Sequence, residues 1–81
     1  MASLDSVVQQ MRNLAEDDSV PSNVSEMLVE ASEILENEEK DLSVRVNSAS
    51  SVLDRVSNDP NIKQHTRTEI WNLASKTDSL S

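Results

Sequence analysis

The sequence contains no glycine and no cysteine, and these two absences exclude several classes of function. Without glycine the chain cannot form the phosphate-binding loop, the dinucleotide fingerprint or the EF-hand calcium loop. Each of those motifs needs glycine where the backbone turns sharply or approaches a phosphate. Without cysteine it has no disulfide, no zinc-thiolate site and no thiol nucleophile. We therefore expect an intracellular, cytoplasmic protein with no metal and no cofactor.

Aromatic residues and long apolar runs are also scarce. Phenylalanine and tyrosine are absent, and aromatic residues make up 1% of the chain. The core must therefore be built from Leu, Ile, Val, Met and Ala. No apolar run approaches the roughly 18 residues of a membrane span. The N-terminus also lacks a signal-peptide pattern, so we expect no membrane contact.

Charge of one sign dominates, with 15 acidic against 7 basic residues and a net charge of −8. Such a surface repels phosphate, which disfavours direct nucleic-acid binding. Two explanations of the charge stay open. The surface can simply be soluble and self-repelling, or it can be adapted to a salt-rich cytoplasm, where the screening length falls to about 3 Å.

Apolar residues recur with helical spacing in four segments. This periodicity predicts helices over about residues 3–17, 21–37, 43–57 and 64–77. Ser3 and Ser43 are expected N-caps, and the spacing of Thr66 and Glu69 predicts a capping box at the start of the last helix. The predicted fold is all-α: an antiparallel up-and-down four-helix bundle forming one domain over residues 1–81.

Shifting the chain against itself by about 42 residues aligns its apolar positions. Leu14 then matches Val56, and Val20 matches Ile62. This period is close to that of HEAT-type repeats, so two HEAT-like helix pairs are an alternative description of the same four helices. Val44 and Val52 fall off the apolar seam of the third helix. They can widen the buried face or contact a second copy, which leaves a monomer or a weak homodimer.

The stretch 58–75 is the most distinctive part of the chain, since it holds the only Trp and the only His. Asp59 and Pro60 break the preceding helix. Arg67 and Trp71 lie one helical turn apart, which would let the guanidinium cover the indole. Trp71 can cap the end of a small core, or it can anchor a partner, because Trp and Arg dominate interface hot spots.

The residues that could perform catalysis are few. His65 could be oriented by Glu69 or share a metal with it, but one His and one Glu are too few ligands for a tight site. A helix-start His that bonds nearby backbone is the alternative. No Ser lies in a nucleophile-elbow motif, because that motif needs glycine. The sequence therefore predicts a protein that is not an enzyme.

Two segments resemble a known family. These are Val20–Pro21 followed by Asn23, and Asp59–Pro60–Asn61 followed by the run from His65 to Trp71. Both resemble the small archaeal proteins grouped as uncharacterised protein family 0147. The resemblance implies a four-helix bundle and an archaeal source, but no activity. The chain has Ser22 and Ser25 where the family usually carries basic residues, and this loss of positive charge favours the halophilic explanation.

Three functional hypotheses follow. The first is a non-enzymatic protein–protein interaction module that contacts an unknown protein partner through His65, Arg67 and Trp71, with Asp59 and Pro60 setting the loop. The second is an accessory factor of nucleic-acid or ribosome-associated machinery, acting through a local basic spot formed by Lys63, His65 and Arg67. The third is a small metal or catalytic protein centred on His65.

Overall fold

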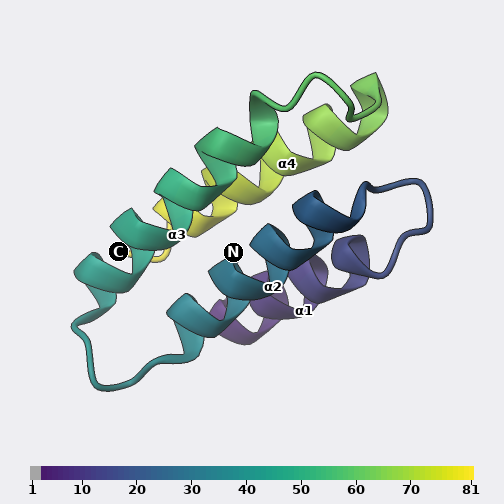
Figure 1. Ribbon diagram of the computed structural model, residues 1–81. Coiled ribbons are helices and arrows are strands. Elements are labelled where there is room, and N and C mark those ends of the chain that lie inside the picture. The colour runs from purple at the N-terminus through teal and green to yellow at the C-terminus, as the bar shows by residue number, and fades with distance from the viewer. Residues whose placement is uncertain (1–2) are drawn as a thin grey trace.

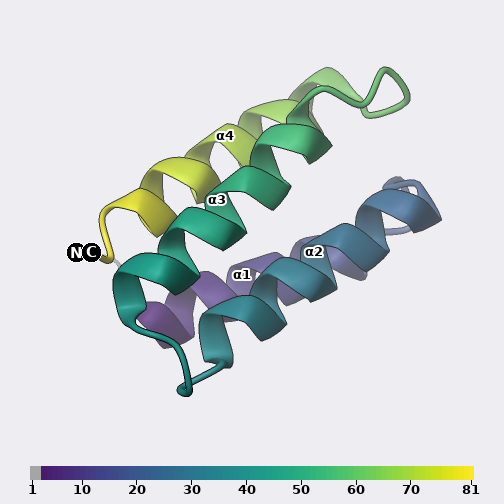
Figure 2. The ribbon, with the colours of Figure 1, turned by 60° about the vertical axis from the view of Figure 1, so that its left-hand side comes forward.

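The computed structural model describes residues 3–81, which form four α-helices joined by short loops. They are α1 (Leu4–Ala15), α2 (Ser22–Glu36), α3 (Leu42–Ser57) and α4 (Gln64–Asp78). Each helix packs antiparallel against the next, and α4 closes the bundle against α1 (Figures 1 and 2). The predicted all-α four-helix arrangement is confirmed. The observed helices start and end within two residues of the predicted positions.

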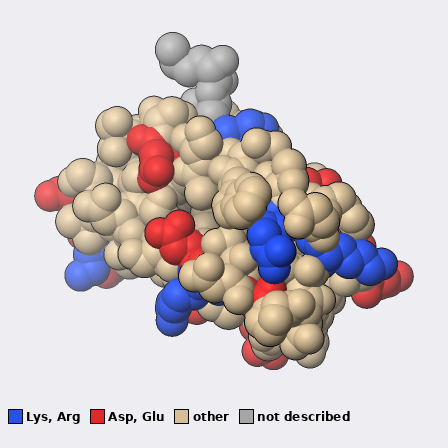
Figure 3. Space-filling view, turned by 90° about the horizontal axis from the view of Figure 1, so that it is seen from above, with Lys and Arg blue, Asp and Glu red and all other residues tan. Residues whose placement is uncertain are grey.

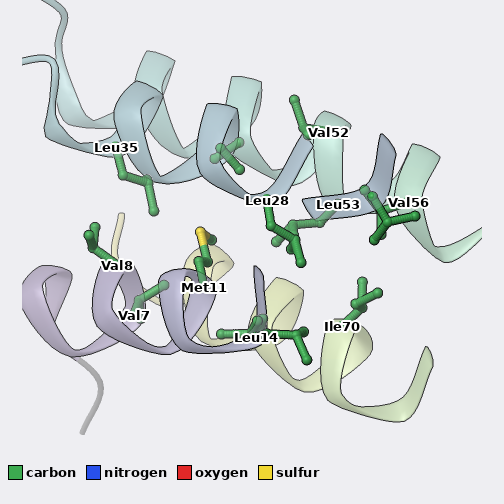
Figure 4. Close-up of a cluster of buried hydrophobic side chains, with 14 of the residues drawn as sticks. Val7, Val8, Met11, Leu14, Leu28, Leu35, Val52, Leu53, Val56 and Ile70 are labelled. Atoms are coloured by element: carbon green, nitrogen blue, oxygen red, sulfur yellow. The ribbon is translucent and has the colours of Figure 1, made fainter. Parts of the chain in front are cut away.

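The four helices share one aliphatic core, as the composition predicted. Figure 4 shows Met11, Leu28, Leu53 and Ile70 converging on it, one from each helix. All four of these side chains are fully buried. Of the two valines off the predicted seam of α3, Val52 is buried and widens the core face, whereas Val44 is 47% exposed. No helix within residues 3–81 combines the length and the hydropathy needed to cross a bilayer.

The three loops are closed by the same kind of hydrogen bond. In each, a side chain near the start of one helix donates to a carbonyl at the end of the previous helix, ten residues earlier in the chain. The pairs are Ser25 Oγ with the Ala15 carbonyl, Arg45 Nη1 with the Leu35 carbonyl (2.9 Å), and Arg67 Nε with the Ser57 carbonyl (2.9 Å). Helix-end carbonyls lack a partner within the helix, so these bonds satisfy groups that would otherwise need water.

A second repeated bond lies inside each loop. A side-chain oxygen accepts from the backbone N–H two residues later, which is an Asx turn. The acceptors are Asp17, Asn37 and Asp59, at 2.8, 3.1 and 2.8 Å from their donors. The first and third loops match at a shift of 42 residues in both kinds of bond. The apolar repeat seen in the sequence therefore extends to the polar contacts that connect the helices.

The predicted helix caps are only partly correct. Ser3 caps α1, with its Oγ accepting from the Ser6 N–H at 3.2 Å. Ser43 and Thr66 are not caps, because α3 begins at Leu42 and α4 at Gln64, so both residues lie inside the first helical turn. Thr66 precedes Ile70 by one turn on the same face. Its side chain therefore faces the interior and cannot reach the helix start.

Burial leaves the hydroxyl of Thr66 without a hydrogen-bond partner. Thr66 is 1% exposed, and its Oγ1 is the one buried side-chain N or O atom in residues 3–81 with no partner. The hydroxyl of Thr77 is equally buried but donates to the Leu73 carbonyl at 2.7 Å. The two threonines thus form a matched pair, one unsatisfied and one satisfied.

We expect Thr66→Val to raise the free energy of unfolding by about 1 kcal/mol, because it removes a desolvated hydroxyl that has no partner. Thr77→Val, the control, should lower it by about 1 kcal/mol, since a satisfied hydrogen bond is lost. Urea denaturation followed by circular dichroism measures both. Equal changes in the free energy of unfolding for the two variants would contradict the conclusion that the Thr66 hydroxyl has no hydrogen-bond partner.

Candidate functional site

The loop between α3 and α4 is held by Arg67, which the structure places in the first turn of α4. Its Nε donates to the Ser57 carbonyl at 2.9 Å and its Nη2 donates to the Asp59 carbonyl at 3.0 Å. Arg67 is half-buried. A planar guanidinium suits such paired bonds because its donors diverge at fixed angles. The sequence suggested that the Arg67 guanidinium could cover the Trp71 indole. In the structure this guanidinium is hydrogen-bonded to the loop backbone.

Asp59 connects the same loop to α2. One carboxylate oxygen accepts from the Asn61 N–H at 2.8 Å, and the other accepts from Asn23 Nδ2 at 3.0 Å. These two bonds, helped by the charge of Arg67, lower the pKa of Asp59 below its ordinary value of 3.8. Asp59 therefore stays ionised at neutral pH and ties the two halves of the bundle together.

The loop between α1 and α2 lies at the same end of the bundle (Figures 1 and 2). The backbone N–H and the hydroxyl of Ser19 both donate to Asp17 and lower its pKa. The nearby side chains of His65 and Lys63 lower it further by electrostatic interaction. The basic spot predicted from the sequence therefore has an ionised carboxylate beside it.

Trp71 is not part of the core. Its side chain is 53% exposed, the highest fraction among the exposed large apolar residues. His65 and Pro60 are also exposed. On the face of α3 and α4 that Figure 3 shows, basic and acidic side chains are scattered between broad uncharged areas. Residues 59–71 form a corner of the bundle. Of the five predicted site residues in this corner, three face solvent (Trp71, His65 and Pro60), while Asp59 and Arg67 form its internal bonds.

The internal bonds of the corner were missed by the sequence interpretation. The signal available for them was the 42-residue shift, which pairs Arg67 with Ser25 and Asp59 with Asp17. Nothing in the sequence indicated that Asn23 would reach Asp59 from α2, because the two residues are 36 positions apart. Residues 3–81 contain no group of three or more His, Asp or Glu side chains placed to hold a metal ion.

Residues 1–80 match the model of the uncharacterised protein family UPF0147. The chain belongs to UPF0147. The resemblance noted at the Asp59–Trp71 stretch is therefore confirmed. The family description carries no activity, and no solved structure matches the chain.

Archaeal UPF0147 proteins are similar over most of their length. The chain is 43% identical over 70 residues to one from Methanothermobacter thermautotrophicus, covering 86% of this chain and 69% of the relative. It is 41% identical over 73 residues to one from Methanosarcina mazei, covering 90% and 78%. It is 37% identical over 78 residues to one from Archaeoglobus fulgidus, covering 96% and 88%.

We expect Arg67→Met to destabilise this UPF0147 bundle by about 1–3 kcal/mol, because two partly buried carbonyls lose a charged donor while the apolar stem is kept. Arg55→Met is the control, since Arg55 is exposed near the end of α3, and it should change stability by less than about 0.5 kcal/mol. Urea unfolding provides the comparison. If both variants unfold at the same midpoint as the parent, Arg67 does not hold the loop.

Proposed function

We propose that this protein is a non-enzymatic protein-binding module that presents the corner to a partner protein. The observation that supports this best is the exposure of Trp71, at 53%, on a helix that is otherwise amphipathic. An indole offers a large apolar area together with an N–H donor, and it loses few rotamers on binding, which is why Trp is enriched in hot spots.

The corner is also prepared for binding by its internal bonds. Arg67 fixes the loop against the first turn of α4, and Asp59 fixes it against α2. Trp71 lies one turn after Arg67 on the same helix. A partner would therefore meet an ordered surface. Binding to it would cost less conformational entropy than binding that first had to order a flexible loop. Trp71, His65 and Pro60 supply the contacts in this proposal, and Arg67 and Asp59 hold them in place.

The alternative of an accessory factor for nucleic-acid or ribosome-associated machinery is less well supported. Lys63 and His65 are exposed, but Asp17 is close enough to respond to their charge. Arg67 is engaged with two carbonyls. The positive charge left for a phosphate backbone is therefore small, and the net charge of −8 opposes it.

The test is an affinity capture from native extract at native salt concentration, with and without ribonuclease, using the parent protein and Trp71→Ala. We expect one protein partner that resists ribonuclease and is lost with Trp71→Ala, since removal of a hot-spot Trp costs about 2 kcal/mol or more in binding. Circular dichroism should show the fold unchanged, because Trp71 is outside the core.

Val44→Ala is the matched control. Val44 is similarly exposed, at 47%, but lies in the first turn of α3, at the opposite end of that helix from the corner. It should keep the partner. Loss of the partner in both variants would indicate a general apolar effect, and a set of partners that disappears with ribonuclease would favour the accessory-factor alternative.

We also propose that the acidic surface is adapted to high salt. The helix α2 carries four glutamates and no basic residue, and the acidic line Glu26, Glu30 and Glu33 is exposed. One ion pair, Arg12 with Glu36, joins side chains in the described part of the chain. In dilute buffer of about 0.01 M salt, like charges on this surface repel one another over about 30 Å, and molar salt shortens that distance to about 3 Å.

The expected result is a thermal midpoint that rises by several degrees between dilute buffer and molar KCl. The variant with Glu26→Gln, Glu30→Gln and Glu33→Gln should melt higher in dilute buffer and gain less from KCl. Circular dichroism melts of both proteins decide the matter. A cooperative melt in dilute buffer at the same midpoint as in molar KCl would contradict the adaptation.

A further inference from the structure

A groove of about 370 Å³ runs between α1 and α4. These are the two helices that close the bundle, and they meet less closely than the three sequential pairs do. The buried residues Leu14 and Leu73 form part of its lining, one from each helix. A volume of this size lies at the lower end of the range of about 300–1,000 Å³ that small-ligand pockets occupy.

The polar lining of the groove has an unusual composition. Three of its side chains are carboxamides: Gln10, Asn13 and Asn72. Gln10 is bonded to Ser6 and Lys76, and the Asn13 oxygen accepts from Gln9, which leaves the Asn13 nitrogen and the Asn72 carboxamide for a ligand. A carboxamide offers one acceptor and two donors side by side, so it can pair with both the C=O and the N–H of a peptide group. Buried leucines together with accessible carboxamides are the combination that an extended backbone needs, since the backbone must exchange its water for other hydrogen bonds.

The charged lining residues add a preference for basic side chains. Asp17 and Glu69 contribute two carboxylates, and Lys76 contributes one ammonium. Lys76 keeps its positive charge while its Nζ donates to Gln10 Oε1 at 2.9 Å, so the two carboxylates and one ammonium give the lining a net charge of −1. Asp17 is kept ionised by the two hydrogen bonds from Ser19 that lower its pKa. The groove therefore has negative charge available for a cationic ligand, in a protein of net charge −8.

We propose that the groove between α1 and α4 binds a short extended segment of another protein that carries an Arg or Lys side chain. Asn13 and Asn72 hold its backbone, Leu14 and Leu73 support it, and Asp17 and Glu69 receive the cation. From Glu69 to Lys76 the groove follows α4 for seven residues, or about 10 Å at about 1.5 Å per residue. An extended chain covers that length in about three residues at about 3.3 Å each.

This site shares Glu69 with the corner but contains none of the residues Trp71, His65 and Pro60 that are proposed to contact the corner's partner. The groove residues Glu69, Asn72 and Lys76 follow one another at spacings of three and four, so they share one side of α4. Trp71 lies two residues after Glu69, about 200° around the helix, and it is not part of the groove lining. The proposal consequently does not depend on the proposed function of the corner, and either can fail alone.

The experiment is a titration of the ¹⁵N-labelled protein, followed by NMR, with the end-blocked tripeptide Ala-Arg-Ala. We expect saturable shifts in the side-chain amide signals of Gln10, Asn13 and Asn72. The double variant Asp17→Asn with Glu69→Gln keeps the shape of both side chains, and the carboxamide oxygen introduced by Asp17→Asn can still accept from Ser19. This variant should bind about tenfold more weakly, because charged hydrogen bonds to the peptide cation are lost.

Further arms separate backbone recognition from charge. Asn13→Leu with Asn72→Leu should also weaken binding about tenfold, whereas Trp71→Ala should leave the affinity unchanged. The proposal fails if Ala-Arg-Ala gives no saturable shift, or if end-blocked Ala-Glu-Ala binds equally well. It fails too if arginine amide alone matches the tripeptide, which would indicate a simple cation site. Groove shifts that depend on protein concentration without peptide would overturn it in favour of a second copy of the chain.

Discussion

The structure depends on how a chain without glycine ends its helices. Helices commonly finish with a residue in the left-handed region, usually glycine, so that the last carbonyls can be bonded by the turn itself. Among residues 3–81 no residue has a positive φ, so that solution is not used. Backbone N–H groups of the turns bond some of the last carbonyls, and side chains of the following helix, from Ser25, Arg45 and Arg67, bond one more at the end of each of α1, α2 and α3. One carbonyl at the end of each of α1, α2 and α3 is therefore bonded only when the next helix has packed against it.

This dependence explains why the sequence predicted the fold better than the candidate site. The four helices follow from apolar spacing, which is a local property of each segment, and burial of that face decides where the helix lies. Thr66 shows the limit of local rules. Its spacing to Glu69 satisfied the capping-box pattern, but its place on the inner face, one turn before Ile70, turned the side chain inward. Burial of the Thr66 side chain in the core therefore outweighed the hydrogen bond that it could have made as a helix cap.

The candidate site could be located from the sequence, but its internal structure could not. Unusual residue types marked the stretch 58–75. The roles within it depend on contacts across the bundle: Asn23 reaches Asp59 from another helix, and Arg67 reaches back over ten residues to Ser57. Exposure of Trp71 is likewise a tertiary property, because helical position alone put it beside the inner face. The groove between α1 and α4 left no signal at all, since its lining comes from the two ends of the chain.

The position of Trp71 has a consequence for the spectroscopy of this protein. It is the only Trp, and no Tyr accompanies it, so every photon of intrinsic emission comes from one indole that is already more than half solvent-exposed. Its environment changes less than that of a buried indole when the helices separate, which makes fluorescence a weaker monitor of unfolding than it is for a core Trp. For the same reason the emission of the native protein is free to respond when another molecule covers that surface. Trp71 fluorescence is therefore suited to detecting a molecule that covers this surface, whereas unfolding is better followed by the circular dichroism of the backbone.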